Sequence, residues 1–394
     1  MRVAIISCGL LDTMLPLVRY LSKFAEVDLY IHVYGNMFTD ALGAFDLKGQ
    51  PYGMISESNS TEILGRQLSG YVKNDTDRVR IRMFRYPDLK ILNKKNYKLN
   101  RRFARHLNNE KYDLVHFNGY RGSLFFIYAF FNQKMGKVWS IHDPIQHSGE
   151  FKWPTEIGYR LMRFLKVHII IHNQTQIPEF ISKYKIRSAR CHFIRFGPLE
   201  VFHIFKNGVP RQTSPHSVLF YGRISPYKGV EYLIEAAKIA RESIPDLKVI
   251  IAGKPNYPLD LDAIREDNTF EIHDRYIPNH ELVKYIQQAE LVVCPYTDAT
   301  QSGVIMTAYA FNKPVLATSV GGIPEMVDDG KTGKLIPPKD SVALAEAMVG
   351  MLKDEKLMTS LRENLSFNNP EGKFSWKQIA KHTMDVYQQA VSSD

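Results

Sequence analysis

Short apolar runs alternate with stretches of helical periodicity along the whole chain. Runs of this kind are typical of strands buried on both faces, and a helix between two such runs returns the chain so that the strands lie parallel. The strands expected in the first half are Val3–Ser7, Val27–Val33, Val79–Phe84, Leu114–Phe117, Lys137–Ile141 and Val167–Ile171, and its clearest helices are Leu15–Phe24 and Lys98–Asn108. The pattern predicts a parallel α/β sheet.

The second half repeats this alternation. Its expected strands are Val218–Tyr221, Lys248–Ala252, Thr269–Ile272, Leu291–Cys294, Val315–Ala317 and Lys334–Ile336, and the helices between them are Val230–Arg241, Asn279–Ala289, Val304–Phe311 and Ser341–Leu352. Two repeats of the same architecture predict two doubly wound domains.

The composition between the two repeats indicates where one domain ends. Residues 205–215 are rich in Gly, Pro and polar side chains, as in a linker. We expect a first domain at 1–204, a second at 205–372 and a final helix within 373–394 that packs back on the first domain. The carboxyl ends of both sheets are expected to face each other across a cleft, where such folds bind ligands.

Composition and charge narrow the class of protein. The chain has 394 residues, 23% charged and 12% aromatic, which excludes a disordered or fibrous protein. Its three cysteines form no disulfide or metal-binding pattern, so a cytoplasmic location is expected. The longest apolar run, 124–131, is too short to span a membrane.

The net charge of +10 is concentrated in one half. Residues 1–200 contain 30 Lys and Arg against 17 Asp and Glu, whereas residues 201–394 contain 21 against 24. Residues 66–111 alone contain 14 basic and four acidic side chains. This segment is either a solvated basic face or the surface that meets an anionic partner.

The pattern of residues 98–107 bears on whether this basic segment is a solvated face or a surface for an anionic partner. Leu99, Phe103 and Leu107 lie on one helical face, and basic residues occupy the remainder. Such a helix fits an anionic inner membrane leaflet, which predicts a peripheral location, but the apolar stripe fits the protein's own sheet equally well. Nucleic acid is not expected as a partner, because no recognised binding fold is present.

The first strand-to-helix turn excludes two common activities. Between Ser7 and Asp12 it has a single glycine, Gly9, where a dinucleotide-binding fingerprint needs three. No P-loop sequence is present either. A nicotinamide-dependent oxidoreductase and a P-loop NTPase are therefore not expected.

Two cations follow the first strand of the second half. Arg223 and Lys228 lie on the loop after Tyr221, just before a helix that begins near Gly229. Arg donates forked hydrogen bonds and Lys supplies a point charge, and a helix N-terminus also attracts anions. The loop therefore predicts a diphosphate site, against the alternative of two ordinary surface bases.

A second loop of the same half has features of an anion site. The strand that ends near Pro295 is followed by Gln301, Ser302, Gly303 and Val304, where a helix begins. Glycine allows a ligand to approach the backbone, and the N–H groups of the first helical turn lack acceptors. With Arg223 and Lys228 in the same domain, this loop is a candidate phosphate-binding segment.

The second half resembles the donor-binding domain of retaining glycosyltransferases of family 4, the glycosyl transferases group 1, which have the two-domain GT-B fold. The resemblance covers nearly all of residues 217–355 and is thinner in the first half. The segments that carry it are Tyr221–Gly229, Ile250–Gly253, Ala289–Tyr296, Ala310–Glu325 and Gly330–Pro337, and in the first half Tyr112–Phe117, Trp139–Asp143 and Ile194–Pro198.

The resemblance implies roles for individual residues. It implies two Rossmann-like domains, with the donor diphosphate bound by Arg223 and Lys228 and the donor sugar faced by His142. It also implies that Gly9, Gly222 and the segment 301–304 line the donor site. A structural histidine at a strand end is the alternative for His142.

The resemblance further implies a reaction without metal or cofactor. The donor would be a nucleotide sugar, a UDP-sugar ahead of a GDP-sugar, and the acceptor a lipid-linked or cell-surface glycan precursor in polysaccharide biosynthesis. No metal-binding pattern is evident in the sequence, because Asp260 and Asp262 form a lone acidic pair in a Pro-rich loop.

The sequence departs from the family at two positions. Counting back from Lys313, the two usual glutamates correspond to Ala299 and Thr307. In the family the second glutamate holds the ribose hydroxyls, and Thr307 is expected to make one such hydrogen bond. The departure leaves an alternative to a transferase, namely an inactive homologue that binds or regulates an active enzyme.

We therefore expect a retaining hexosyltransferase of the GT-B fold. The rival is the inactive homologue. A GT-B epimerase is a further alternative, whereas a phosphorylase is disfavoured because no cofactor-lysine motif is evident.

Overall fold

The computed structural model describes residues 1–74, 76–90, 93–119, 127–128, 135–145, 153–206, 213–365 and 372–392. The chain divides into two compact units, unit 1 (Met1–Gly197 with Lys373–Asp394) and unit 2 (Pro198–Gly372). The apolar run 124–131, except for 127–128, and most of the expected linker lie outside the described residues.

Unit 1 is built on an eight-stranded sheet with the order β10-β9-β8-β7-β1-β2-β6-β5. All neighbouring pairs are parallel except β5 and β6. The strands are β1 (Arg2–Ser7), β2 (Glu26–Tyr34), β5 (Gly53–Met54), β6 (Val79–Tyr86), β7 (Leu114–Asn118), β8 (Gly136–Ile141), β9 (His168–Ile171) and β10 (Cys191–Phe193).

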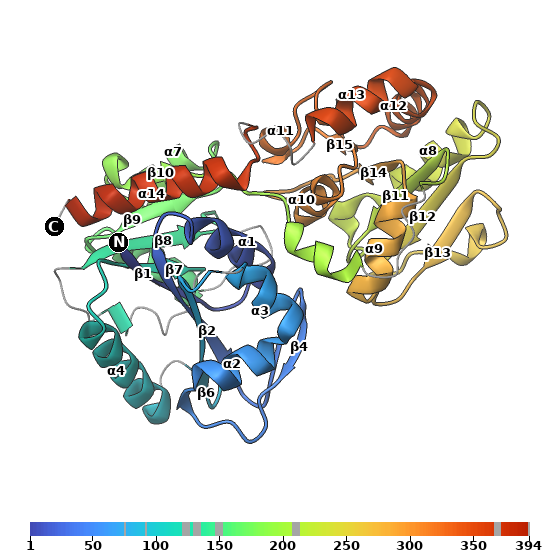
Figure 1. Cartoon of the computed structure of the whole chain (residues 1–394). Helices are drawn as coiled ribbons and strands as arrows, with labels where there is room; N and C mark the ends of the chain where they lie inside the picture. Colours follow the sequence, from blue (N-terminus) through green and yellow to red (C-terminus); the bar gives the residue numbers. More distant parts are fainter. Residues whose placement is uncertain are drawn as a thin grey trace. The chain divides into compact units, whose positions relative to one another are not determined.

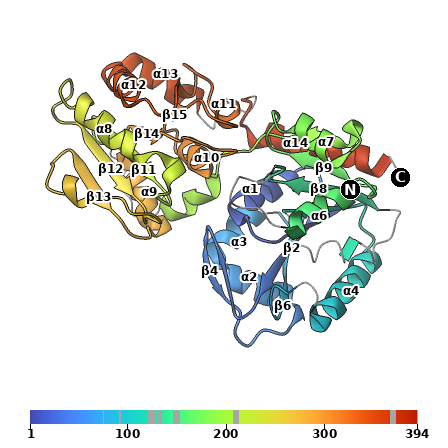
Figure 2. The ribbon, with the colours of Figure 1, turned by 180° about the vertical axis from the view of Figure 1, so that it is seen from behind.

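Helices cover this sheet, and the last of them comes from the end of the chain (Figures 1 and 2). They are α1 (Leu11–Leu21), α2 (Glu57–Leu64), α3 (Arg66–Lys73), α4 (Lys94–Asn109), α6 (Trp153–Met162), α7 (Ile177–Tyr184), α14 (Trp376–Ser392) and the 3-10 turn η1 (Ser188–Arg190). Helix α14 packs on α1 and β8. The hairpin of β3 (Met37–Asp40) and β4 (Gly43–Asp46) forms a separate antiparallel pair.

Unit 2 contains a six-stranded parallel sheet with the order β13-β12-β11-β14-β15-β16. Its strands are β11 (Ser217–Tyr221), β12 (Lys248–Ala252), β13 (Phe270–His273), β14 (Leu291–Cys294), β15 (Val315–Thr318) and β16 (Gly333–Ile336). Its helices are α8 (Val230–Ala240), α9 (Asn279–Gln288), α10 (Gly303–Ala310), α11 (Ile323–Met326), α12 (Ser341–Lys353) and α13 (Glu355–Asn364), with 3-10 turns η2 (Glu200–Lys206), η3 (Pro226–Lys228) and η4 (Asp262–Ile264).

The apolar runs of the sequence form the cores of the two sheets. Most residues of β1, β2, β7, β8, β11 and β14 are buried, as expected of strands covered on both faces. In both units the strands expected from the sequence form, with ends that differ by one or two residues. The expectation of a mixed α/β protein with two parallel sheets is confirmed.

Several bounds differ from the expected ones by more than two residues, and one of them is the start of α4, at Lys94 rather than Lys98. Helix α1 begins at Leu11 rather than Leu15, because Pro16 is accommodated inside the helix instead of marking its start. Unit 2 begins at Pro198 rather than at 205, because η2 packs on α9 and α10 of that unit.

The structure shows where the apolar stripe of helix α4 packs. Phe103, Ala104 and Leu107 are buried in the core of unit 1. The opposite face carries six exposed cations, Lys94, Lys95, Lys98, Arg101, Arg102 and Arg105. The stripe therefore packs on its own sheet, and only the basic face is available to a partner.

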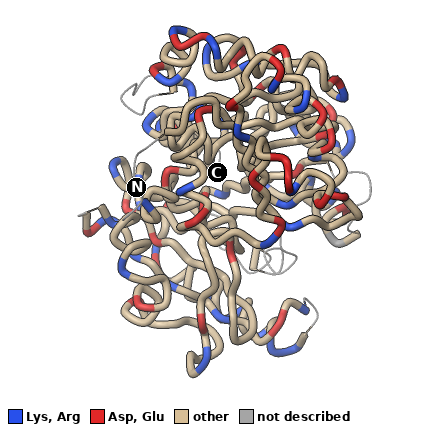
Figure 3. Tube along the Cα trace, turned by 90° about the vertical axis from the view of Figure 1, so that its right-hand side faces the viewer, with Lys and Arg blue, Asp and Glu red and all other residues tan. Residues whose placement is uncertain are grey.

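The basic face of α4, defined by those six side chains, carries no acidic side chain of its own helix. Elsewhere along the trace of the described residues both signs of charge are interspersed (Figure 3). Helix α4 contains no Asp or Glu, and none of its six cations forms an ion pair with a described residue. No described helix is long and apolar enough to cross a membrane.

Candidate functional site

The loop after β11 positions Arg223 and Lys228. Strand β11 ends at Tyr221, η3 follows, and Gly229 precedes the first residue of α8. Arg223 is exposed and Lys228 is partly buried. Both cations therefore lie at the carboxyl edge of the sheet in unit 2, beside a helix N-terminus, where anions bind in such folds.

The ammonium of Lys228 is held by aromatic rings. Its Nζ lies 4.0 Å from the ring centroid of Tyr296 and 5.3 Å from that of Tyr227. Burial, together with the positive charge of Arg223, lowers the pKa of Lys228 below its ordinary value. Neither Arg223 nor Lys228 forms an ion pair with a described residue, so both charges are available to an anionic ligand.

Glycine is required where the Lys228 loop meets the next strand. Gly229 has φ 64°, and a Cβ there would overlap the carbonyl oxygen of Pro295. Gly222, also with positive φ, lies against Val304, which brings this loop next to the start of α10. The two loops predicted to bind phosphate are therefore neighbours in unit 2.

Some hydrogen-bonding groups at the start of α10 are already bonded to other groups of the protein. The Ser302 hydroxyl accepts from Ile305 N at 3.4 Å, and its backbone N–H donates to Met326 Sδ at 3.3 Å. The sequence predicts that the backbone N–H groups at the start of this helix are open to a ligand, but that of Ser302 is already bonded. Those of Gly303, which is exposed, and Val304 remain for an anion.

The residues at the two glutamate positions lie inside the fold. Thr307 is 4% exposed, and its hydroxyl donates to the carbonyl of Gly303 at 2.8 Å. Ala299 is also buried, and its carbonyl accepts from Gly322 N at 3.1 Å. The Thr307 hydroxyl proton is thus already committed within α10. Gln301 differs, because its buried Nε2 has no hydrogen-bond partner among the described residues.

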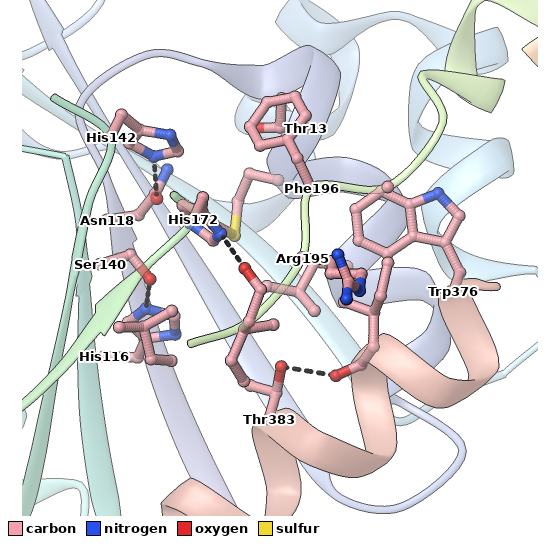
Figure 4. A pocket seen from close by; sticks show the side chains of 16 residues that line it. Thr13, His116, Asn118, Ser140, His142, His172, Arg195, Phe196, Trp376 and Thr383 are labelled. Atoms are coloured by element: carbon pink, nitrogen blue, oxygen red, sulfur yellow. Dashed lines mark hydrogen bonds between the residues drawn. The ribbon is translucent and has the colours of Figure 1, made fainter. Parts of the chain in front are cut away.

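In unit 1, His142 directly follows β8 and lines a cavity of about 30 Å³, which can hold a water molecule. Its Nε2 lies 2.9 Å from Asn118 Oδ1, and its ring centroid lies 5.0 Å from that of His172 (Figure 4). Three histidines, His116, His142 and His172, line this cavity together with Arg195.

Burial keeps these histidines neutral. It lowers the pKa of His116 to about 3, that of His172 to about 4, and that of His142 well below the ordinary value. Since the neighbouring rings oppose a further positive charge, His142 is an uncharged hydrogen-bonding group at neutral pH. Its chemistry is therefore polar contact, not cationic stabilisation.

Gly9 lies in the loop between β1 and α1, with φ 120°. The neighbouring Asp40 accepts from Leu11 N at 3.3 Å and so caps α1 from the β3 strand. Burial and the Asp40 charge raise the pKa of Asp12 to about 7. An acidic pair therefore borders Gly9, which makes this loop unlike the cationic loop of unit 2.

Sequence reasoning missed four residues around His142. Asn118 and His116 belong to β7, His172 follows β9, and Arg195 follows β10. Each lies at or near the carboxyl end of its strand. Because such folds bind ligands at the carboxyl ends of their strands, this position in the sequence could have indicated these residues. Among the described residues, no group of three or more His, Cys, Asp or Glu is arranged to hold a metal ion.

Comparison with known proteins identifies the domain type of unit 2. Residues 215–354 match the family model "Glycosyl transferases group 1". The chain is similar to the D-inositol 3-phosphate glycosyltransferase of Corynebacterium glutamicum, with 32% identity over 196 residues, which are 48% of this chain and 46% of that protein. The match thus spans about half the length of this curated relative.

Solved structures resemble the whole chain. A glycosyltransferase of Rickettsia africae matches with a TM-score of 0.66 at 14% identity, covering 100% of this chain and 99% of that one. The Anabaena protein Alr3699/HepE, solved in complex with UDP, matches with a TM-score of 0.62 at 17% identity, covering 98% and 99%.

These findings define the class. The chain has the GT-B fold, and the resemblance to GT-B glycosyltransferases of family 4 is confirmed. Within it, residues 215–354 of unit 2 are similar to the glycosyl transferases group 1 family.

Proposed function

We propose that this protein is a retaining glycosyltransferase that uses a nucleotide-diphosphate sugar. In the reaction, the acceptor hydroxyl oxygen replaces the diphosphate on the anomeric carbon and loses its proton. Negative charge develops on the leaving diphosphate, and cations fixed beside it stabilise the transition state. Arg223 and Lys228 supply these charges, so the proposal needs no metal.

The observation that supports this proposal is that Arg223 and Lys228 form no ion pair with a described residue. Both lack an anionic partner among the described residues, and Lys228 is held over Tyr296 at the sheet edge. A partly buried, unpaired ammonium beside a second cation is costly without a ligand. A diphosphate satisfies both. The UDP in the Alr3699/HepE structure supports a UDP-sugar as the donor.

The acceptor is proposed to lie at an anionic membrane surface. The basic face of α4 supports this, because its six exposed cations, which form no ion pair with a described residue, attract anionic lipid. A lipid-linked glycan precursor is the matching acceptor class. The protein is then peripheral, held by charge, with its apolar stripe retained in its own core.

The donor role is tested by Arg223→Ala and Lys228→Ala. We expect each variant to lower nucleotide-sugar turnover by two or more orders of magnitude, about 3 kcal/mol or more, while circular dichroism stays unchanged and the melting temperature does not fall. The matched control is Lys238→Ala, which removes an exposed cation of α8 that forms an ion pair with Glu235. Full activity in either variant would exclude the assigned role.

One observation favours a second candidate, an inactive homologue that binds a nucleotide sugar and partners another enzyme. Both glutamate positions of the family are filled by residues whose polar groups are used within the fold, Ala299 and Thr307. Calorimetry with UDP- and GDP-sugars, followed by assays of donor hydrolysis and transfer, separates the two. Tight binding without either reaction would favour the homologue.

A further inference from the structure

A chain of hydrogen bonds connects His142 to the loop of Gly9. His142 Nε2 lies 2.9 Å from Asn118 Oδ1, Asn118 Nδ2 lies 3.3 Å from Ser7 Oγ, and Ser7 Oγ lies 2.5 Å from the carbonyl oxygen of Gly9. Ser7 and Asn118 are 0% and 1% exposed, so both side chains are shielded from bulk solvent. The chain is therefore a closed path inside unit 1.

The direction of every bond in this path follows from its last member. A backbone carbonyl only accepts, so the Ser7 hydroxyl donates its single proton to Gly9. Ser7 Oγ must then accept from Asn118, which turns the NH₂ group of that amide toward Ser7 and its oxygen toward His142. His142 can only meet that oxygen as a donor, from Nε2–H.

We propose that Ser7 and Asn118 are positioning residues that hold His142 as the Nε2–H tautomer and leave its Nδ1 as the hydrogen-bond acceptor. A group that meets Nδ1 must then bring a proton, as a sugar hydroxyl does and a phosphate oxygen of an ionised diphosphate does not. The tautomer therefore selects the hydroxyl-bearing part of a donor at this point.

The sheet makes this arrangement rigid. Ser7 and Asn118 are register partners on the adjacent parallel strands β1 and β7, at their carboxyl ends. Asn118 is in turn the register partner of Ser140 on β8, two residues before His142. Three neighbouring strands thus fix the three side chains, and the positive φ of Gly9 directs the carbonyl that ends the path.

Other groups around His142 do not replace this path. His172 uses its Nδ1 on the Ile194 carbonyl at 2.7 Å, and His116 is bonded to Tyr387 and Ser140. Arg195 lines the same cavity and forms no ion pair with a described residue. Asn118 is therefore the neighbour that decides which ring nitrogen of His142 carries the proton.

The tautomer is tested directly by long-range ¹H–¹⁵N correlation spectra of the full chain labelled in its histidines. The His142 resonances are assigned by their loss in His142→Gln. We expect a protonated Nε2 and an unprotonated Nδ1 in the wild type at neutral pH. In Ser7→Ala the amide of Asn118 loses its fixed acceptor, and we expect His142 to shift toward a mixture of both tautomers.

Two further variants separate a local role from general damage. Ser140→Ala removes a hydroxyl from the same cavity that bonds His116, and we expect it to leave the His142 spectrum unchanged. Asn118→Asp keeps the accepting oxygen and adds a charge that favours imidazolium, so His142 should titrate at higher pH than in the wild type. An unchanged His142 spectrum in both Ser7→Ala and Asn118→Asp would overturn the proposal.

The role of this hydrogen-bond path in catalysis rests on the proposed function. The tautomer measured in the spectra does not depend on it. For a donor that the wild type turns over, we expect Ser7→Ala to lower kcat about 10–100-fold with little change in nucleotide affinity. A shifted tautomer with unchanged kcat would refute the positioning role alone. A wild type that turns over no donor would refute the proposed function and leave the tautomer assignment standing.

Discussion

At the scale of single residues, burial acts on two predicted site residues in the same direction but with different results. It lowers the pKa of both His142 and Lys228. The shift leaves His142 neutral at physiological pH, whereas a lysine starts from a far higher pKa and keeps its charge. His142 is therefore suited to contact a hydroxyl, and Lys228 to hold an anion.

Asp12 illustrates the opposite shift and yields a prediction. Its pKa is raised to about 7 by burial and by Asp40, so folding takes up a proton between the unfolded value near 4 and pH 7. Stability conferred by the protonated form is present below pH 4 and is lost as the pH rises through 7. Asp12→Asn should therefore stabilise the protein by about 1–2 kcal/mol at pH 8, since the carboxyl is partly exposed, and by little near pH 4.

Denaturant unfolding at several values between about pH 4 and pH 8 measures this difference. The control is Asp385→Asn, which removes an exposed carboxylate from α14 of the same unit. A gain for Asp12→Asn that is independent of pH would show that ionisation of the buried Asp12 carboxyl does not cause it.

At the scale of elements, the β11–α8 loop depends on one backbone conformation. Gly229 has φ 64°, and a Cβ there would overlap the Pro295 carbonyl, so Gly229→Ala is expected to destabilise the protein by at least about 2 kcal/mol. Because Lys228 is the adjacent residue, the variant should also weaken nucleotide binding. Thermal melting and calorimetry measure the two effects.

The matched control for that change is Gly350→Ala. Gly350 is exposed within α12, and a Cβ there would meet no atom within 4 Å. The added methyl group should stabilise the protein by about 0.5–1 kcal/mol and leave nucleotide binding unchanged. Equal effects of both substitutions on stability and on nucleotide binding would contradict the requirement for glycine at position 229.

The basic face of α4 gives the second prediction at this scale. A triple variant, K98E/R101E/R105E, should lower binding to anionic vesicles more than tenfold, since each cation near such a surface is worth about 1 kcal/mol. Co-sedimentation with vesicles of anionic and of zwitterionic lipid measures it. The control, K353E/K356E/K381E, changes the net charge equally at exposed sites elsewhere.

Equal binding by the two triple variants would mean that net charge, and not α4, is responsible. If the wild type shows no preference for anionic lipid, the basic face of α4 is a solvated surface and does not bind membranes.

At the scale of the whole molecule, the end of the chain completes the first sheet unit. Helix α14 packs on α1 and β8, and Tyr387 is fully buried with its hydroxyl 2.7 Å from His116 Nδ1. The assignment of α14 to unit 1 links residues separated by all of unit 2. Unit 1 therefore cannot complete its core until α14 (Trp376–Ser392) has been synthesised.

This arrangement predicts a local effect of Tyr387→Ala. Loss of a buried aromatic side chain should cost about 3–5 kcal/mol, and hydrogen exchange should rise in β7 and β8 while the strands of unit 2 keep their protection. Lys381→Ala, an exposed substitution on the same helix, is the control. Equal loss of protection in both units would show that they unfold together.

Local sequence patterns were enough to predict the strand–helix alternation, the two sheets and the place of Arg223 and Lys228 in the loop after β11. These depend on local patterns, because burial on both faces needs continuous apolar runs and an anion site needs cations beside a helix start. The resemblance to GT-B enzymes was likewise readable from motifs.

Which polar groups remain free follows from the tertiary packing alone. It commits the hydroxyls of Ser302 and Thr307 to the fold, buries the apolar stripe of α4 and assembles Ser7, Asn118 and His142 from three strands. The reason is physical. Hydrogen-bond partners and tautomers depend on side chains far apart in the sequence, whose approach is fixed by strand order and register.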